Sequence, residues 1–158
     1  MEIIDIHLGI KSALDDAIAR AVAIGGLAAI ALIHILQLPD AFAAIGYLGA
    51  LFIAAIVGCL ALASVLTRTS DDRVWMAAGG LPALILLGYI ISRSVGLPGF
   101  TDDVGEWSEP LGLLSMVAEG LMVFVTAALL ATRHYPVRRA AATSAPESAA
   151  MRPGPAVG

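Results

Sequence analysis

Three ionisable side chains fall inside apolar stretches of this sequence, where charge is expensive. His34, Arg93 and Glu119 each lie within, or at the end of, a run long enough to cross a lipid bilayer. Ionisable groups inside a membrane mark ligand sites, ion sites or proton relays by default. A carboxyl group in that setting must be paired or neutral, because an unpaired charge is strongly disfavoured in a low dielectric. These three residues are therefore the first candidates for a functional site.

Each candidate has a polar neighbour on the same side of its predicted helix. These neighbours lie three or four positions away and are Gln37, Tyr89 and Ser115. Residues three or four apart share a helix face. If the helices turn these faces toward one another, the six side chains form one polar pocket, which predicts a ligand or proton site.

A structural interpretation of the same residues stays open. His34 could bind a backbone carbonyl, and Arg93 could reach the lipid headgroups or form a structural ion pair with Glu119. Four acids precede the last apolar run, and this interpretation treats them as solvated: Asp102, Asp103, Glu106 and Glu109.

The sequence signals for a metal, a cofactor or catalysis are weak. His34 and Glu119 could each bind a metal ion, but no H-x-x-x-H or E-x-x-H spacing is present. Haem would need a second axial ligand, and neither His7 nor His134 lies within a span. Cys59 is the only cysteine and sits mid-span among small residues, which favours a packing role. We find no nucleophile–base motif and no phosphate loop, so we expect no catalytic residues and no enzyme activity.

The elements that must position these residues are four apolar blocks. The chain has 158 residues, of which 59% are hydrophobic, and its charges lie between the blocks. A bilayer-spanning helix needs about 20 mostly apolar residues. The predicted spans cover about 18–38, 41–66, 74–92 and 110–132. The predicted fold class is all-α, a four-helix transmembrane bundle occupying residues 17–132.

The flanking segments and the span ends carry further signals. Residues 1–16 have an apolar stripe and predict a short amphipathic helix that lies on the membrane surface or packs against the bundle. A turn signal at 37–40 predicts the end of the first span. Small residues recur every fourth position along the second span, at Gly46, Ala50, Ala54 and Gly58, and place that span at the centre of the packing, although the same ladder could serve dimerisation. Residues 133–158 lack an apolar period and predict a disordered tail.

The basic residues predict the orientation. Eight Lys and Arg residues fall on one side of the spans, and only Arg93 falls on the other. Cytoplasmic segments hold the excess of basic residues, so we expect a plasma (inner) membrane protein with both termini cytoplasmic. An A-x-A pattern at 41–43 also fits signal-peptidase cleavage, but the preceding apolar run is too long for a signal peptide and another span follows directly.

Three motifs carry a resemblance to known proteins. They are Ile33-His34-Ile35 with Pro39 beyond it, the run from Tyr89 through Arg93 to Gly99, and Glu109-Pro110-Leu111-Gly112 leading to Glu119. This pattern resembles a group of small, uncharacterised four-helix integral membrane proteins from high-GC Gram-positive bacteria. The resemblance implies that His34, Arg93 and Glu119 occupy recurrent motif positions, and it implies no particular activity.

Two functions follow as expectations. The first is a small binding or accessory protein whose outer polar cluster contacts a small ligand, a metal ion or a partner subunit in a larger membrane complex. The second is a small proton-coupled or ion transporter that acts as a homo-oligomer. Both place the chain in the lipid bilayer, and the scattered arginines form no patch suited to nucleic acid.

Overall fold

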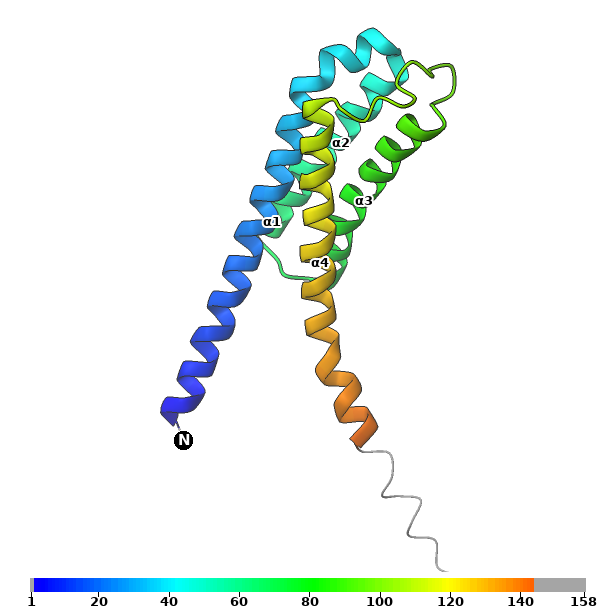
Figure 1. Ribbon diagram of the computed structural model, residues 1–158. Coiled ribbons are helices and arrows are strands. Elements are labelled where there is room, and N and C mark those ends of the chain that lie inside the picture. The colour runs from blue at the N-terminus through cyan, green and yellow to red at the C-terminus, as the bar shows by residue number, and fades with distance from the viewer. Residues whose placement is uncertain (1, 144–158) are drawn as a thin grey trace, which may run out of the picture.

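Four helices make up almost all of the described chain (Figure 1). The computed structural model describes the backbone of residues 2–143 and the side chains of residues 13–133. The helices are α1 (Glu2–Ala44), α2 (Gly46–Leu66), α3 (Asp72–Ser94) and α4 (Pro110–Thr143). The segments long and apolar enough to cross a bilayer are Ala13–Ala44, Gly46–Leu66, Asp72–Ser94 and Pro110–Arg133. The predicted all-α class with four spans is confirmed, and the chain is a multi-pass membrane protein.

Large apolar side chains cover the outer faces of all four helices. Leu32 on α1, Leu51 on α2, Leu84 on α3 and Phe124 on α4 are each more than half exposed. Soluble proteins rarely leave so much apolar surface uncovered. Lipid chains solvate such side chains at no cost, whereas the backbone must satisfy its own hydrogen bonds, which is why every span is a helix.

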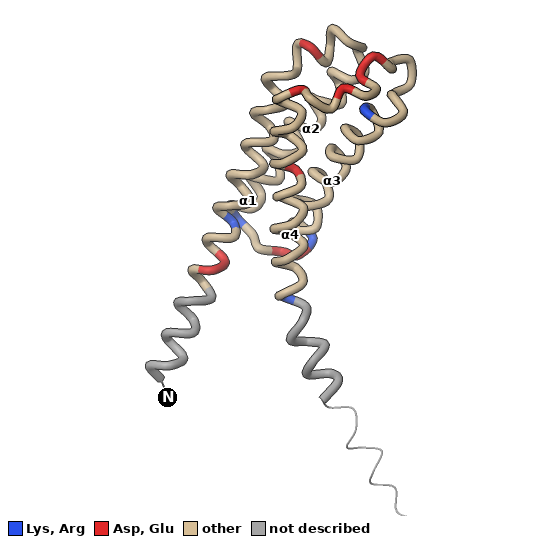
Figure 2. The backbone as a smooth tube through the Cα atoms, in the orientation of Figure 1, with Lys and Arg blue, Asp and Glu red and all other residues tan. Residues whose placement is uncertain are grey.

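Charged residues gather at the two ends of the bundle (Figure 2). We call the end that carries the α3–α4 loop (residues 95–109) the loop end. We call the opposite end, which carries the α2–α3 link (residues 67–71), the link end. Between the two ends, Glu119 lies about halfway along the spanning part of α4. The nearest other charged residue of the described part of α4 is Arg133 at the link end.

The predicted break between the first two spans is misplaced. The turn signal at 37–40 does not end the helix, because α1 runs through Pro39 to Ala44. Proline removes only one backbone donor, and in an apolar setting the other backbone groups gain more from staying helical. The chain reverses at Ile45 instead, where the backbone is extended (φ −160°, ψ 136°). Figure 1 shows the last part of α1 turning toward α2.

This reversal is tight because Gly49 has no side chain. A Cβ at Gly49 would lie 2.4 Å from the ring of Phe42. The glycine thus lets α2 fold back directly against the end of α1, and these two helices form the most extensive helix pair in the bundle.

The two flanking segments also differ from the sequence-based prediction. Residues 2–16 are not a separate surface helix, because they continue without interruption into the first span as part of α1. The predicted tail begins too early, because α4 continues through residues 133–143. Residues 144–158 lie outside the described part of the chain.

The helices are arranged as a ring in the order α2, α1, α4, α3. Each helix packs on its two ring neighbours, and the α2–α3 pair is the least extensive of the four neighbouring pairs. The prediction that α2 is the centre of the packing is wrong. Gly46, Ala50 and Ala54 are exposed, whereas Gly58 is half-buried and a Cβ there would lie 2.8 Å from Leu81 of α3. The small-residue ladder is therefore not the main packing surface within one chain.

The core fills the half of the bundle toward the link end. Its buried residues come from all four helices and are Ala23, Leu27, Ile30, Ala31, Ile56, Cys59, Ala63, Leu66, Trp75, Ala78 and Met122. Helix α1 contributes the most complete apolar stripe. The thiol of Cys59 lies within this core, in the packing role expected for it.

Close approach of α3 and α4 depends on a glycine. A Cβ at Gly79 would lie 2.2 Å from Oγ1 of the buried Thr126, whereas a Cβ at Gly80 would have nothing within 4 Å. Gly79→Ala and Gly80→Ala increase the intrinsic helix propensity of the chain by the same amount. We therefore expect Gly79→Ala to be about 1 kcal/mol less stable than Gly80→Ala, because only the first overpacks the interface. Reversible unfolding in mild detergent measures the difference, and equal stabilities would contradict the packing described here.

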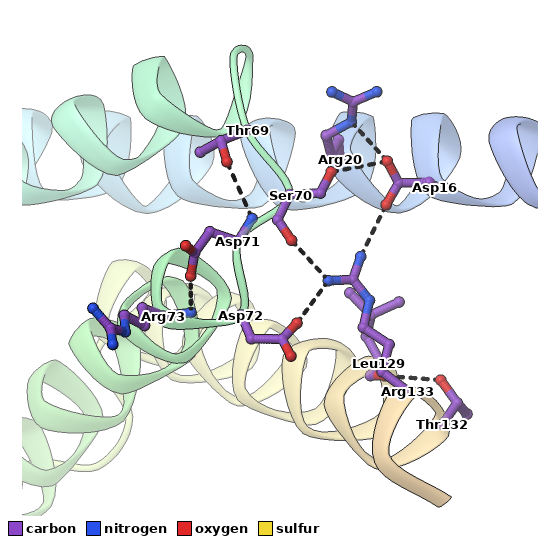
Figure 3. A network of polar contacts seen from close by, with 10 residues as sticks. All are labelled: Asp16, Arg20, Thr69, Ser70, Asp71, Asp72, Arg73, Leu129, Thr132 and Arg133. Carbon is purple, nitrogen blue, oxygen red and sulfur yellow. Dashed lines mark hydrogen bonds and ion pairs between the residues drawn. The ribbon is translucent and has the colours of Figure 1, made fainter. Parts of the chain in front are cut away.

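One arginine ties three segments together at the link end (Figure 3). Arg133 of α4 donates to Asp16 of α1 at 2.8 Å, to Asp72 of α3 at 3.0 Å and to the carbonyl of Ser70 at 3.0 Å. Its guanidinium also lies 5.3 Å from the centre of the Trp75 ring. Arg133 was predicted to begin the tail, but it closes this end of the bundle.

Candidate functional site

A cavity of about 520 Å³ lies toward the loop end and is lined by all four helices and the α3–α4 loop. The six predicted site residues all line it: His34, Gln37, Tyr89, Arg93, Ser115 and Glu119. The sequence-based expectation that their helix faces converge is thus met by the geometry. Whether they bind a ligand or a proton stays a prediction.

Glu119 lies at the buried side of this cavity. Its side chain is 1% exposed, and its Oε1 accepts a hydrogen bond of 2.6 Å from Ser115 Oγ, one turn earlier in α4. Its Oε2 is buried and has no hydrogen-bond partner among the described residues. A buried carboxyl oxygen without a partner is costly, and such atoms in a cavity are the ones that a ligand can satisfy.

His34 faces Glu119 from α1. The Nε2 atom of His34 lies 4.0 Å from Oε1 of Glu119, and its Nδ1 lies 2.9 Å from the carbonyl oxygen of Ile30. A carbonyl oxygen only accepts hydrogen bonds, so Nδ1 carries a hydrogen and Nε2 is the atom that can gain or lose one. The expected backbone hydrogen bond of His34 is therefore present, and it orients Nε2 toward the carboxyl group. The ring also packs on Phe52, with centroids 4.9 Å apart.

Arg93 is held by two acids rather than by Glu119. Its guanidinium donates to Glu109 Oε2 at 2.7 Å, forms an ion pair with Asp103 and lies 5.1 Å from the centre of the Tyr89 ring. The predicted alternative of an Arg93–Glu119 bridge is wrong. Arg93 lies at the end of α3, next to the start of the α3–α4 loop that carries Asp103 and Glu109. Glu119 lies more than two helical turns after the first residue of α4, away from that loop.

The loop acids divide into two groups. Asp103 and Glu109 bind Arg93, so treating them as merely solvated is wrong. Asp102 and Glu106 are exposed, as that interpretation expects. The distinction follows from the loop's path, because the backbone N–H of Gly105 donates to the carbonyl of Arg93 at 2.9 Å and brings the neighbouring Asp103 inward.

Gln37 and Tyr89 connect the loop to the helices. Gln37 Nε2 of α1 donates to Glu109 Oε1 at 3.0 Å, so Glu109 joins α1 and α3. Tyr89 packs edge-on against Trp107, with centroids 6.2 Å apart. Its ring reaches α4 because Gly112 has no side chain, since a Cβ there would lie 2.8 Å from the Tyr89 ring. The polar end of the cavity is thus a connected network.

The remaining walls are apolar and were not predicted as site residues. Apolar lining residues of α2, α3 and the α3–α4 loop include Leu51, Phe52, Ala55, Leu84, Ile85 and Phe100. Asp40 of α1 adds an acid at the rim. Leu51 and Leu84 are 57% and 68% exposed, so the cavity opens toward the lipid-facing surface between α2 and α3. Apolar residues within a hydrophobic span carry no signal that separates lining from lipid contact, so only their position in the bundle reveals this role.

A metal site finds no support among the described residues. No group of three His, Cys, Asp or Glu side chains in that part of the chain lies close enough to hold a metal ion. His34 and Glu119, the two weak candidates, lack a third ligand.

Comparisons with protein-family models, with curated proteins and with solved structures give no match to this chain. The resemblance to small four-helix membrane proteins of high-GC Gram-positive bacteria therefore stays a prediction.

Proposed function

We propose that this protein binds a small amphipathic molecule taken from the lipid phase. The observation that carries the proposal is the cavity itself, which has apolar walls, a polar end and a buried, unpartnered carboxyl oxygen on Glu119. Ligand sites for small molecules are concave and mostly apolar, have a few convergent polar groups, and measure about 300–1,000 Å³. The volume and lining here fall within that description.

Access from the bilayer is supported by the packing of the helices. The α2–α3 contact is the least extensive between ring neighbours, and the two helices carry the exposed wall residues Leu51 and Leu84. A molecule dissolved in the membrane meets this opening without crossing the polar loop. Its apolar part would lie between α2 and α3, and its polar part would face Glu119 and Gln37.

The features of the lining favour binding over catalysis. Ser115 donates its hydrogen bond to Glu119, and His34 Nδ1 is engaged with the backbone of its own helix. A nucleophile-activating triad needs the serine to donate to the histidine and the histidine to be oriented by the acid. Ser115, His34 and Glu119 have the residue types of such a triad, but the serine donates to the acid and not to the histidine.

The packing beneath the cavity favours binding over passage through the bundle. The apolar core lies between the cavity and the link end, with Leu27, Cys59 and Met122 fully or almost fully buried. The hydroxyl of Thr126 is buried and donates to the backbone of its own helix. A transporter would need a polar path through this region, so the transporter alternative receives no support from this conformation.

We further propose a plasma-membrane location with both termini cytoplasmic, which would put the loop end and its cavity on the outer side. The eight-to-one division of basic residues supports this orientation.

Filling the cavity tests the proposal. Ala55 is a buried lining residue of α2, whereas Ala61 of α2 is exposed and does not line the cavity. In lipid nanodiscs, scintillation proximity measures saturable binding of tritiated decyltrimethylammonium, decanol and decanoate, each of which has a ten-carbon chain. We expect Ala55→Trp to weaken binding of the probe that binds most tightly by at least about tenfold, because the ring takes the ligand's place. Ala61→Trp should leave binding unchanged.

Two results would count against the proposal. One is the absence of saturable binding for all three probes. The other is an equal effect of Ala55→Trp and Ala61→Trp, which would mean that the probes associate with the outer surface of the helices.

A further inference from the structure

The charges around the cavity are unbalanced in favour of acids. Four carboxyl groups line it, from Asp40, Asp103, Glu109 and Glu119. Among the described residues, Arg93 is the only Lys or Arg that lines the cavity, and its guanidinium is already engaged by Asp103 and Glu109. An anionic ligand would therefore meet like charge without an available basic partner, whereas a cationic ligand would meet complementary charge.

The buried carboxyl group supplies an observation independent of this acidic surround. Glu119 is 1% exposed, and its Oε2 lacks a hydrogen-bond partner among the described residues. The closest basic group to it is the imidazole of His34, whose Nε2 stands 4.0 Å from the other oxygen. This separation is longer than a hydrogen bond, so His34 does not satisfy the Glu119 carboxyl group and a ligand can supply a closer counter-charge.

The His34–Glu119 pair can release a proton when such a ligand binds. Its Nδ1 hydrogen is fixed on the Ile30 carbonyl, so Nε2 can release a proton without loss of that hydrogen bond. With His34 neutral, a ligand cation becomes the partner of the Glu119 carboxylate. The exchange removes one proton from the pair and adds one positive charge from the ligand, so the net charge of the site is unchanged.

The other walls fit a lipophilic cation. Phe52 and Phe100 line the cavity and offer aromatic faces, which attract cations that have lost their water. Leu51, Leu84 and Ile85 offer apolar surface for a tail. The cavity thus combines the three recognition elements of an amphipathic cation in one place.

We propose that the ligand of this cavity is a lipophilic cation, such as an amine or quaternary ammonium compound with an apolar tail, bound with its positive charge on Glu119. The inference rests on the proposed binding function and specifies its ligand class.

The test compares head groups on a ten-carbon chain. In nanodiscs of uncharged and zwitterionic lipid, decyltrimethylammonium carries a fixed positive charge, decanol none and decanoate a negative one. We expect the cation to bind at least about tenfold more tightly than decanol and decanoate to bind more weakly still. Glu119→Gln keeps the shape of the side chain and the hydrogen bond from Ser115, so it should reduce cation affinity by at least about tenfold while leaving decanol affinity within about twofold.

A charge-matched control separates this effect from general electrostatics. Glu106→Gln removes one negative charge from an exposed position of the α3–α4 loop that does not line the cavity. We expect it to change cation affinity by no more than about twofold. Asp40→Asn, at the rim of the cavity, provides a second variant and should weaken cation binding less than Glu119→Gln does.

The outcomes distinguish this inference from the proposal beneath it. If decanol or decanoate binds as tightly as the cation, and Ala55→Trp abolishes that binding, the cavity is a ligand site and the cation inference is wrong. If Glu119→Gln and Glu106→Gln weaken cation binding equally, the charge is not held by Glu119. If no probe binds saturably, both the inference and the proposed function fall.

Discussion

Replacement of Arg93 by methionine is expected to lower the free energy of unfolding by about 2–3 kcal/mol. The substitution keeps most of the apolar stem but leaves Asp103 and Glu109 facing each other without a cation. Breaking a fully buried ion pair typically costs about 3–5 kcal/mol. The cost is smaller here because the Asp103 and Glu109 side chains are 35% and 41% exposed and can regain water.

In Arg93→Met, the α3–α4 loop should unfold before the helices do. Trp107 contacts Tyr89, which in turn lies beneath Arg93. In a Trp75→Phe background, Trp107 fluorescence reports the loop end alone, since the chain has two tryptophans. We expect Arg93→Met to alter that fluorescence at denaturant concentrations that do not yet change the helical circular dichroism.

Arg73→Met provides the matched control for this prediction. Arg73 is an exposed arginine of the same helix, and its change should stay within about 0.5 kcal/mol. Arg93→Lys should recover only part of the loss, because an ammonium group cannot bind two carboxylates in the forked geometry of a guanidinium. Equal stability of Arg93→Met and Arg73→Met would show that the loop does not depend on this arginine.

Replacement of Arg133 by methionine should destabilise the opposite end by about 2 kcal/mol. Like Arg93, Arg133 contacts two carboxylates and one aromatic ring through its guanidinium. Its loss separates Asp16 of α1 from Asp72 of α3 and removes the donor to the Ser70 carbonyl. The side chain is 25% exposed, compared with 8% for Arg93, so the expected cost is at the lower end of the range given for Arg93.

The measurement for Arg133 is equilibrium unfolding in mild detergent, with Arg68→Met as the control. Arg68 is exposed in the α2–α3 link at the same end of the bundle. Because Arg93 and Arg133 share no contact, the double substitution should be additive within about 0.5 kcal/mol. A loss at Arg133 no greater than that at Arg68 would mean that the polar contacts of Figure 3 do not hold the helices together.

The spans and the site residues could be predicted from the sequence because both depend on one strong physical signal. Charge is excluded from a bilayer, so the apolar runs marked the helices and the few ionisable residues inside them marked the cavity. His34, Arg93 and Glu119 were found in this way, and their polar neighbours followed from helical spacing.

Features that depend on tertiary contacts were not predictable in the same way. Pro39 carries a local turn signal, but the apolar surroundings favour a continuous helix, and the reversal depends on Gly49 fitting against Phe42. The ion-pair partners of Arg93 depend on the path of the α3–α4 loop. The role of Arg133 depends on two acids that lie far away in the sequence, and nothing near residue 133 indicates them.

Photolabelling inside a bilayer can show whether a cationic amphiphile occupies the cavity. A decyltrimethylammonium analogue with a diazirine in its tail is activated by light in nanodiscs, and mass spectrometry locates the adducts. We expect adducts on the cavity walls of α2 and α3, such as Leu51 and Ile85, and their loss in Ala55→Trp. Adducts spread evenly over outward-facing residues such as Leu32, Val57 and Phe124 would contradict it, because these residues meet lipid without lining the cavity.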